Sequence, residues 1–222
     1  MAFVIALGVL VSGSGSNLQA IVDAAQAGTI DARVAVVVSN VAGAKAVERS
    51  RAAGIRTQVI DHRGYADRRA FDAAVVEVLR ECGVDLVVLA GFMRVVSDVL
   101  LGAFPWRVVN IHPALLPAFS GLHGQKQAVD AGVRIAGCTV HFVDSGMDTG
   151  PIIAQAAVPV LPDDDEESLG ARILEQEHML FPSVLQWFAE GRVEVIPSAG
   201  DGMRPRVCVH GASTAFGLRQ LG

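Results

Sequence analysis

Short apolar runs alternate with segments of helical periodicity along the first half of the chain. The runs are rich in Val and Ile and apolar at consecutive positions, as in strands that are covered on both faces of a parallel sheet. This alternation predicts an α/β fold with a doubly wound, Rossmann-like sheet that is parallel in its N-terminal half. The expected strands are Phe3–Val11, Val34–Val38, Thr57–Ile60, Leu86–Leu89 and Val108–Ile111, separated by helices such as Leu18–Ala27, Ala44–Ala53 and Ala70–Cys82.

The pattern changes after Pro113, and the sheet is expected to become mixed in the C-terminal half. A helix near His123–Ala131, apolar strands at Ile135–Val143 and Ile152–Val160, and a long helix from about Leu169 to Glu190 follow. Asp201-Gly202 is expected to turn a hairpin between Val193–Ile196 and Val207–Val209. No linker or repeat interrupts the pattern, so residues 1–210 are predicted to form a single domain and residues 211–222 a loose tail.

Composition and charge narrow the class of partner. The chain has 222 residues, and 18 Lys and Arg against 23 Asp and Glu give a formal net charge of −5. The negative balance argues against a basic stripe for nucleic acid. Only 5% of the residues are aromatic, which argues against a surface on which bases stack. Nucleic acid is therefore not expected as a partner. The apolar start, Met1–Val11, is about half of the roughly 20 residues that cross a bilayer, and it lacks the positive charge of a secretory signal. It is interpreted as a buried strand, with no membrane partner.

Cysteine and histidine positions favour a reducing compartment and no metal. The three cysteines, Cys82, Cys138 and Cys208, are far apart, which argues against a disulfide framework and a Cys-rich zinc site. None of the six histidines pairs with another ligand at the spacing of a His-Glu-x-x-His motif. The expected location is therefore cytoplasmic. The sequence leaves the oligomeric state open, with a homodimer as one alternative.

The first candidate for chemistry is the turn Ser12–Asn17, between the first strand and the first helix. Its two glycines allow close approach of a ligand, and its Ser and Asn side chains lie beside the free amides of a helix start. Leu18 stands where a dinucleotide fingerprint would have a third glycine, and no Gly-Lys-Ser/Thr ending follows. A single phosphate is therefore expected, while a plain turn with a helix cap is the alternative.

The second candidate is Asn110-Ile111-His112-Pro113, at the end of the fifth strand. Strand side chains alternate, so Asn110 and His112 share a face at the carboxyl end of a parallel strand, where open α/β sheets bind ligands. An amide can donate to a developing oxyanion, and an imidazole can exchange a proton near neutrality. A hydrogen-bonded Asn and His with no catalytic role is the alternative.

The third candidate is the loop from Asp144 to Pro151. Two glycines and two acids make a tight turn, but an Asp that reaches the imidazole would also orient it and favour its charged form. Asp148, followed by Thr149-Gly150, is preferred to Asp144, although spacing alone does not choose between them.

In combination, these segments resemble the folate-dependent formyltransferases over residues 12 to about 190. The resemblance rests on SGSGSNLQAI at 12–21, VLAGFMR at 88–94, NIHPALLP at 110–117 with GLH at 121–123, VHFV at 140–143, DTGPI at 148–152 and QEH at 176–178. The phosphate loop and the Gln-Glu-His segment are more typical of the branch that acts on glycinamide ribonucleotide.

The resemblance implies direct formyl transfer from 10-formyltetrahydrofolate, as co-substrate, to the primary amine of glycinamide ribonucleotide in purine synthesis. It assigns catalysis to Asn110, His112 and Asp148. It implies that Gly15, Ser16 and Asn17 hold the ribotide phosphate and that Glu177 contacts its sugar or glycinamide part. The residues implied for the folate are Arg68, Met93, Arg94, Val95 and Val96, with Asn110. The family has Arg-Glu where this chain has Arg68-Arg69, which makes the register of that arginine less certain. His123 and His141 are assigned structural or orienting roles.

Other interpretations predict different features. A formyltetrahydrofolate deformylase would carry a preceding regulatory domain, and a methionyl-tRNA formyltransferase a basic C-terminal domain, for which this chain is expected to have no room. A nucleotide-binding oxidoreductase would have an acid after the second strand, where Ser39-Asn40 stand. A non-catalytic binding module would leave the shared face of Asn110 and His112 as coincidence.

Overall fold

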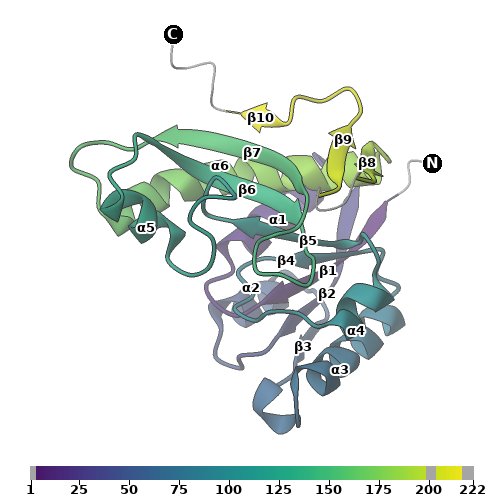
Figure 1. The fold of residues 1–222 in the computed structure, drawn as a ribbon. Helices are drawn as coiled ribbons and strands as arrows, with labels where there is room; N and C mark the ends of the chain where they lie inside the picture. Colours follow the sequence, from purple (N-terminus) through teal and green to yellow (C-terminus); the bar gives the residue numbers. More distant parts are fainter. Residues whose placement is uncertain (1–3, 199–203, 217–222) are drawn as a thin grey trace.

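The computed structural model describes residues 4–198 and 204–216. An eight-stranded sheet forms the centre of the molecule, with strand order β10-β7-β6-β5-β4-β1-β2-β3 (Figure 1). Its strands are β1 (Ile5–Val11), β2 (Ala32–Ser39), β3 (Thr57–Val59), β4 (Leu86–Leu89), β5 (Val108–His112), β6 (Ile135–Phe142), β7 (Ile152–Pro159) and β10 (Ala215–Phe216). The five neighbouring strands β5-β4-β1-β2-β3 are parallel to one another, whereas β6 is antiparallel to both β5 and β7. The predicted fold class, parallel in the first half and mixed in the second, is confirmed.

Helices cover both faces of the sheet, which explains why its central strands are apolar at consecutive positions. One apolar core joins the sheet to α1 (Ser16–Gln26), α2 (Lys45–Ala52), α5 (Gly124–Asp130) and α6 (Glu166–Ala189). A second core joins the opposite face to α3 (Arg68–Glu81) and α4 (Asp98–Ala103). Every residue of β1 and β4 is buried. The short α4 and the 3₁₀ turn η1 (His62–Gly64) are elements that the sequence pattern did not predict.

The helix α6 begins earlier than its apolar pattern indicates. Asp165 caps it, because its side chain accepts from the Ser168 amide while the Ser168 hydroxyl accepts from the Asp165 amide. Glu166 and Glu167 then lie in the first turn, where negative charge is favourable. The helix therefore starts at Glu166, not near Leu169.

The C-terminal segment contains three short strands, and residues 217–222 of the predicted tail lie outside the described residues. β8 (Val193–Ile196) and β9 (Arg206–Val209) pair antiparallel, as predicted, while the expected turn at Asp201-Gly202 lies outside the described residues. Beyond Gly211, β10 adds to the free edge of β7, and the Gln155 amide donates to the Thr214 carbonyl (2.9 Å). Phe216 stacks on Trp187 with 6.2 Å between ring centroids. Residues 215 and 216 thus lie against a sheet edge and the buried ring of Trp187. The single domain over residues 1–210 and the tail after it stay predictions.

The order of the strands places the candidate residues at the carboxyl ends of the parallel strands. The chain passes from β1 outward to β2 and β3, then returns to β4 on the other side of β1. Such a reversal opens a crevice at the carboxyl ends of the strands. The segments after β1, β4 and β5 all start at these carboxyl ends, and they contain Ser12–Asn17, Met93–Val96 and Pro113, respectively. Among the helices in the described parts of the chain, none is long and apolar enough to span a membrane.

Candidate active site

Asn110 and His112 project from the same face at the end of β5. Ile111 between them points into the apolar core, as the alternation of a strand requires. In the antiparallel ladder, Asn110 is opposite His141 and His112 is opposite Thr139. The imidazole is almost enclosed, with His112 only 5% exposed. This arrangement confirms the shared face that the sequence predicts.

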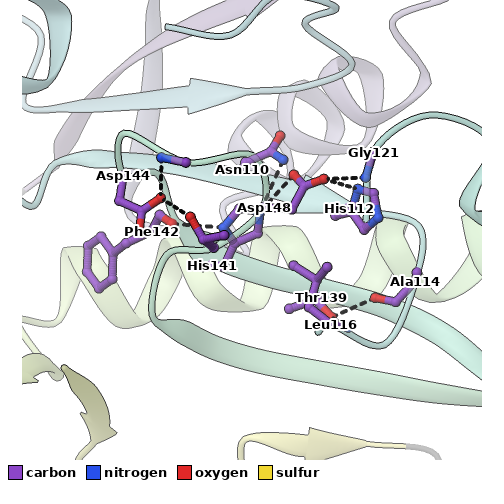
Figure 2. A network of polar contacts seen from close by, with 12 residues as sticks. Asn110, His112, Ala114, Leu116, Gly121, Thr139, His141, Phe142, Asp144 and Asp148 are labelled. Atoms are coloured by element: carbon purple, nitrogen blue, oxygen red, sulfur yellow. Dashed lines mark hydrogen bonds and ion pairs between the residues drawn. The ribbon is translucent and has the colours of Figure 1, made fainter. Parts of the chain in front are cut away.

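Asp148 reaches these side chains from the loop between β6 and β7. Figure 2 shows its carboxylate between Asn110 and His112. Its Oδ2 lies 3.5 Å from Nδ1 of His112 and accepts from the Gly121 amide (2.8 Å). Asp148 adopts a left-handed backbone conformation (φ 55°), which is uncommon outside glycine and is often found at functional sites. The structure therefore brings together the three side chains to which catalysis is assigned.

Asp144 forms hydrogen bonds within the same loop and not with His112. Its Oδ1 accepts from the Gly146 amide (3.1 Å) and from the Thr149 hydroxyl (2.6 Å). These bonds close the loop on itself and hold the segment from which Asp148 extends. The geometry thus distinguishes two acids that spacing alone did not.

Both ring nitrogens of His112 face oxygen atoms. Nε2 lies 2.9 Å from the Phe119 carbonyl, which can only accept, so this nitrogen carries a proton. Nδ1 faces the Asp148 carboxylate at 3.5 Å. The carboxylate can therefore accept from an Nδ1–H, while the Phe119 carbonyl holds the orientation of the ring.

His141 is held neutral beside Asn110. Its Nδ1 lies 2.8 Å from the Phe142 carbonyl and therefore donates, which leaves Nε2 to accept from the Asn110 amide nitrogen at 3.2 Å. Burial lowers the pKa of the His141 imidazole from its ordinary value, an effect that the Phe142 carbonyl and Asp148 oppose. Because an amide nitrogen has two N–H groups, Asn110 keeps one free for a ligand.

The loop after β1 leads into α1 with the geometry of an anion site. Gly15 caps the helix in a left-handed conformation (φ 72°), and a Cβ there would lie 2.7 Å from Cα of Ala46. Ser16 and Asn17 are the first two residues of α1. The amides of a first helical turn lack partners within the helix and attract anions. Only a glycine fits the tight approach to α2 at position 15.

Glu177, from the middle of α6, joins this loop through Asn17. The Asn17 Nδ2 donates to Oε2 of Glu177 at 2.7 Å. Burial raises the pKa of the Glu177 carboxyl to about 7, and the bond from Asn17 opposes that rise. Oδ1 of Asn17 is buried and makes no hydrogen bond with the described residues. A buried acceptor of this kind suits a donor from a ligand.

The residues implied for folate binding differ in exposure. Met93 is 68% and Val95 38% exposed after β4, whereas Val96 is 3% exposed and packs in the second core. The side chain of Val96 is therefore enclosed by the core, and its backbone is the part left to meet a ligand. The Arg94 guanidinium lies 5.2 Å from the centre of the Phe71 ring. Arg68 is the exposed first residue of α3 and forms no ion pair with the described residues. The neighbouring Arg69 instead pairs with Asp98.

The described part of the chain contains no group of three or more His, Cys, Asp or Glu placed to hold a metal ion. The position after β2, where an oxidoreductase would have an acid, is occupied by Asn40, which accepts from the Ser12 hydroxyl at 2.6 Å. Asn40 is an amide whose oxygen is already engaged by Ser12, so it does not supply the carboxylate that would bind a ribose.

Comparison with known proteins identifies the family. The family described as "Formyl transferase" matches residues 6–185, which is most of the chain. The chain belongs to the formyl transferase family. The resemblance seen in the sequence is thereby confirmed, and Asn110, His112 and Asp148, to which that resemblance assigns catalysis, lie within the matched region.

Several formyl transferases are similar to this one over nearly their whole length. The phosphoribosylglycinamide formyltransferase of Escherichia coli is 43% identical over 88% of this chain and 93% of its own. The crystal structure of glycinamide ribonucleotide transformylase 1 from Symbiobacterium toebii shares 52% identity and superposes with a TM-score of 0.88, covering 94% and 95% of the two chains. The trifunctional purine biosynthetic protein adenosine-3 of Drosophila melanogaster is 51% identical, but the match spans only 14% of its length.

The structure adds partners that sequence reasoning did not assign to the site. The Phe119 carbonyl and the Gly121 amide position His112 and Asp148, but backbone groups leave no signature in a sequence. His141 was assigned an orienting or structural role, and the structure shows its partner, Asn110. His123 instead contacts Glu166 (3.0 Å) at the start of α6.

Proposed function

We propose that this formyl transferase moves the formyl group of 10-formyltetrahydrofolate to the primary amine of glycinamide ribonucleotide, a step of purine synthesis. The observation that carries the proposal is the convergence of Asn110, His112 and Asp148 at the carboxyl end of β5. The matches to the Escherichia coli and Symbiobacterium toebii proteins support the choice of substrate, because they cover nearly all of both chains.

The reaction is direct, with no covalent enzyme intermediate. The unprotonated amine of the ribotide attacks the formyl carbon, and the carbonyl electron pair moves to oxygen. The tetrahedral intermediate collapses by breaking the bond between the formyl carbon and the folate nitrogen. The attacking nitrogen loses one proton and the departing nitrogen gains one, so the transfer is balanced without another reactant.

Asn110 and His112 stabilise the oxyanion. The free N–H of Asn110 donates to it, and the Nδ1–H of protonated His112 is available because its 3.5 Å separation from Asp148 is longer than a full hydrogen bond. The loss of one such donor typically slows catalysis by roughly 10²–10³. Asp148 faces Nδ1 of His112 and passes the proton between the two nitrogens through water.

The ribotide and the folate are anionic, and so is the protein. Capture therefore depends on local groups and not on the net charge of −5. In this proposal the amides of Gly15, Ser16 and Asn17 hold the phosphate, and Glu177 accepts from the sugar or glycinamide part. Asn17 Oδ1, buried and without a partner among the described residues, supplies a further acceptor. Met93–Val96, Arg94 and Arg68 hold the folate.

Ribotide dependence tests the proposed function. The protein is incubated with 10-formyltetrahydrofolate in the presence and in the absence of glycinamide ribonucleotide, and formylated ribotide and tetrahydrofolate are both quantified. The proposal expects the two products in equal amounts and only background release without ribotide. A His112→Ala variant supplies that background. Rapid release of formate without ribotide would identify a deformylase and contradict the proposal.

A further inference from the structure

The hydroxyl of Ser12 connects the ends of three neighbouring strands. Ser12 directly follows β1, beside the point where the chain reverses its direction across the sheet. Its Oγ donates to Oδ1 of Asn40, after β2, at 2.6 Å. The same oxygen accepts from the Met93 amide, in the loop after β4, at 2.9 Å. One small side chain thus bridges from β2 to β4 across β1.

The direction of these two bonds is determined by Asn40. A serine hydroxyl has one proton, and once Asn40 has accepted it the lone pairs remain for the Met93 N–H. Asn40 is itself 6% exposed, and its Nδ2 lies 3.3 Å from Nδ1 of His62 in η1. Because both ends of the amide are engaged, the hydroxyl of Ser12 is kept oriented toward Met93.

The rest of the phosphate loop is held by a different element. The Ala46 amide donates to the Gly13 carbonyl (3.1 Å), and Arg49 Nε donates to the Ser14 carbonyl (2.9 Å), both from α2. Within the described residues, the hydrogen bonds that join residues 12–15 to residues 91–96 both involve Ser12: its amide donates to the Gly91 carbonyl (3.0 Å), and its hydroxyl accepts from Met93. Removal of the hydroxyl therefore frees the Met93 amide and leaves only the backbone bond to Gly91 between the two loops, while α2 still holds residues 13 and 14.

We propose that Ser12 is a positioning residue that ties the Met93 loop to the phosphate loop and thereby sets the affinity for the folate co-substrate. This inference rests on the proposed function, in which Met93–Val96 hold the folate. Within the described residues, the hydrogen bonds of Ser12 go to Asn40, Gly91 and Met93 and not to Asn110, His112 or Asp148. Its loss is therefore expected to affect folate binding and not the chemical step.

Kinetics of Ser12→Ala test this role. We expect the KM for 10-formyltetrahydrofolate to rise about 5- to 10-fold, as the loss of one hydrogen bond and the freed loop imply. The KM for the ribotide and kcat are expected to stay within about twofold to threefold, by the same reasoning. Ser12→Thr keeps the hydroxyl and is expected to restore the folate KM. Calorimetric binding of a folate analogue gives the same comparison without turnover.

Ser39→Ala is the matched control. Ser39 is the fully buried last residue of β2. Its hydroxyl likewise donates once, to the Val41 carbonyl (2.8 Å), and accepts once, from the Val41 amide (3.1 Å). It closes a local turn only, so its loss is expected to lower the melting temperature without changing the folate KM.

Two results would overturn the inference: a folate KM for Ser12→Ala equal to that of Ser39→Ala, or equal rises in both substrate KM values. If the wild type is active, either result refutes only the role of Ser12 and leaves the proposed function standing. Absence of ribotide-dependent transfer by the wild type refutes the proposed function itself.

Discussion

The side-chain nitrogen of Asn110 lies 3.2 Å from Nε2 of His141, its direct neighbour across the β5–β6 ladder. The Phe142 carbonyl engages the other ring nitrogen of His141 and so makes Nε2 an acceptor. The Asn110 amide is therefore oriented by a neutral imidazole, with its second N–H directed away from that bond. Figure 2 shows this pair next to Asp148 and His112.

Replacement of His141 is expected to slow catalysis without abolishing it. In His141→Ala, Asn110 loses the partner that orients it, and kcat is expected to fall about 5- to 10-fold, as for the loss of one buried hydrogen bond. Stopped-assay kinetics and folate binding at equilibrium measure the two effects separately. An unchanged kcat would show that Asn110 does not depend on His141.

Glu177 is expected to make stability depend on pH. Burial raises its pKa from 4.5 to about 7 in the folded chain. Between these values the unfolded chain has released a proton that the folded chain still holds, so stability falls as the pH rises from about 4.5 to about 7, by up to about 3 kcal/mol.

Urea unfolding of the wild type and Glu177→Gln over this pH range measures the effect. The glutamine keeps an acceptor for Asn17 and cannot titrate, so the difference between the two stability curves is expected to level off above pH 7. Parallel curves for the two proteins would contradict the buried, protonated state of Glu177.

Gly15→Ala is expected to damage the phosphate loop. A left-handed backbone costs an alanine about 1–2 kcal/mol, and the new Cβ would also lie 2.7 Å from Cα and Cβ of Ala46. Gly28→Ala is the matched control, because Gly28 has a similar φ (68°) but open space around the new Cβ. Both variants are expected to lose stability in thermal unfolding, and only Gly15→Ala to raise the ribotide KM. Equal KM values for the two would count against the loop as the phosphate site.

The period of a strand made part of this site predictable from the sequence. Asn110 and His112 share a face because their spacing is two residues, and no other information is needed. Whether Asp144 or Asp148 reaches the imidazole depends on loop closure by Thr149 and Gly146, which spacing does not reveal. The Ser12 bridge could not be predicted without the order of the strands, since β4 lies beside β1 in the sheet although β2 and β3 separate them in the sequence.

Other differences have similar physical causes. α4 has six residues, of which only Leu100 is buried, so its periodic signal is too short to detect. Val96 follows two exposed positions in the same loop, and tertiary packing alone decides that it joins the core. β10 consists of two residues that gain their strand conformation from the edge of β7. Local sequence patterns carry little information about a strand that is so short and that pairs only at the edge of the sheet.

The comparison of Asp148→Asn with Asp144→Asn tests the central claim most directly. Both asparagines keep an oxygen that can accept a hydrogen bond, so the loop is expected to fold in both variants. We expect Asp148→Asn to lower kcat by about 10²–10⁴, the usual range for a general acid–base group, while folate binding stays close to the wild-type value. Asp144→Asn is expected to retain wild-type kcat. Full activity of Asp148→Asn in this measurement would contradict the assignment of formyl transfer to the Asn110, His112 and Asp148 set.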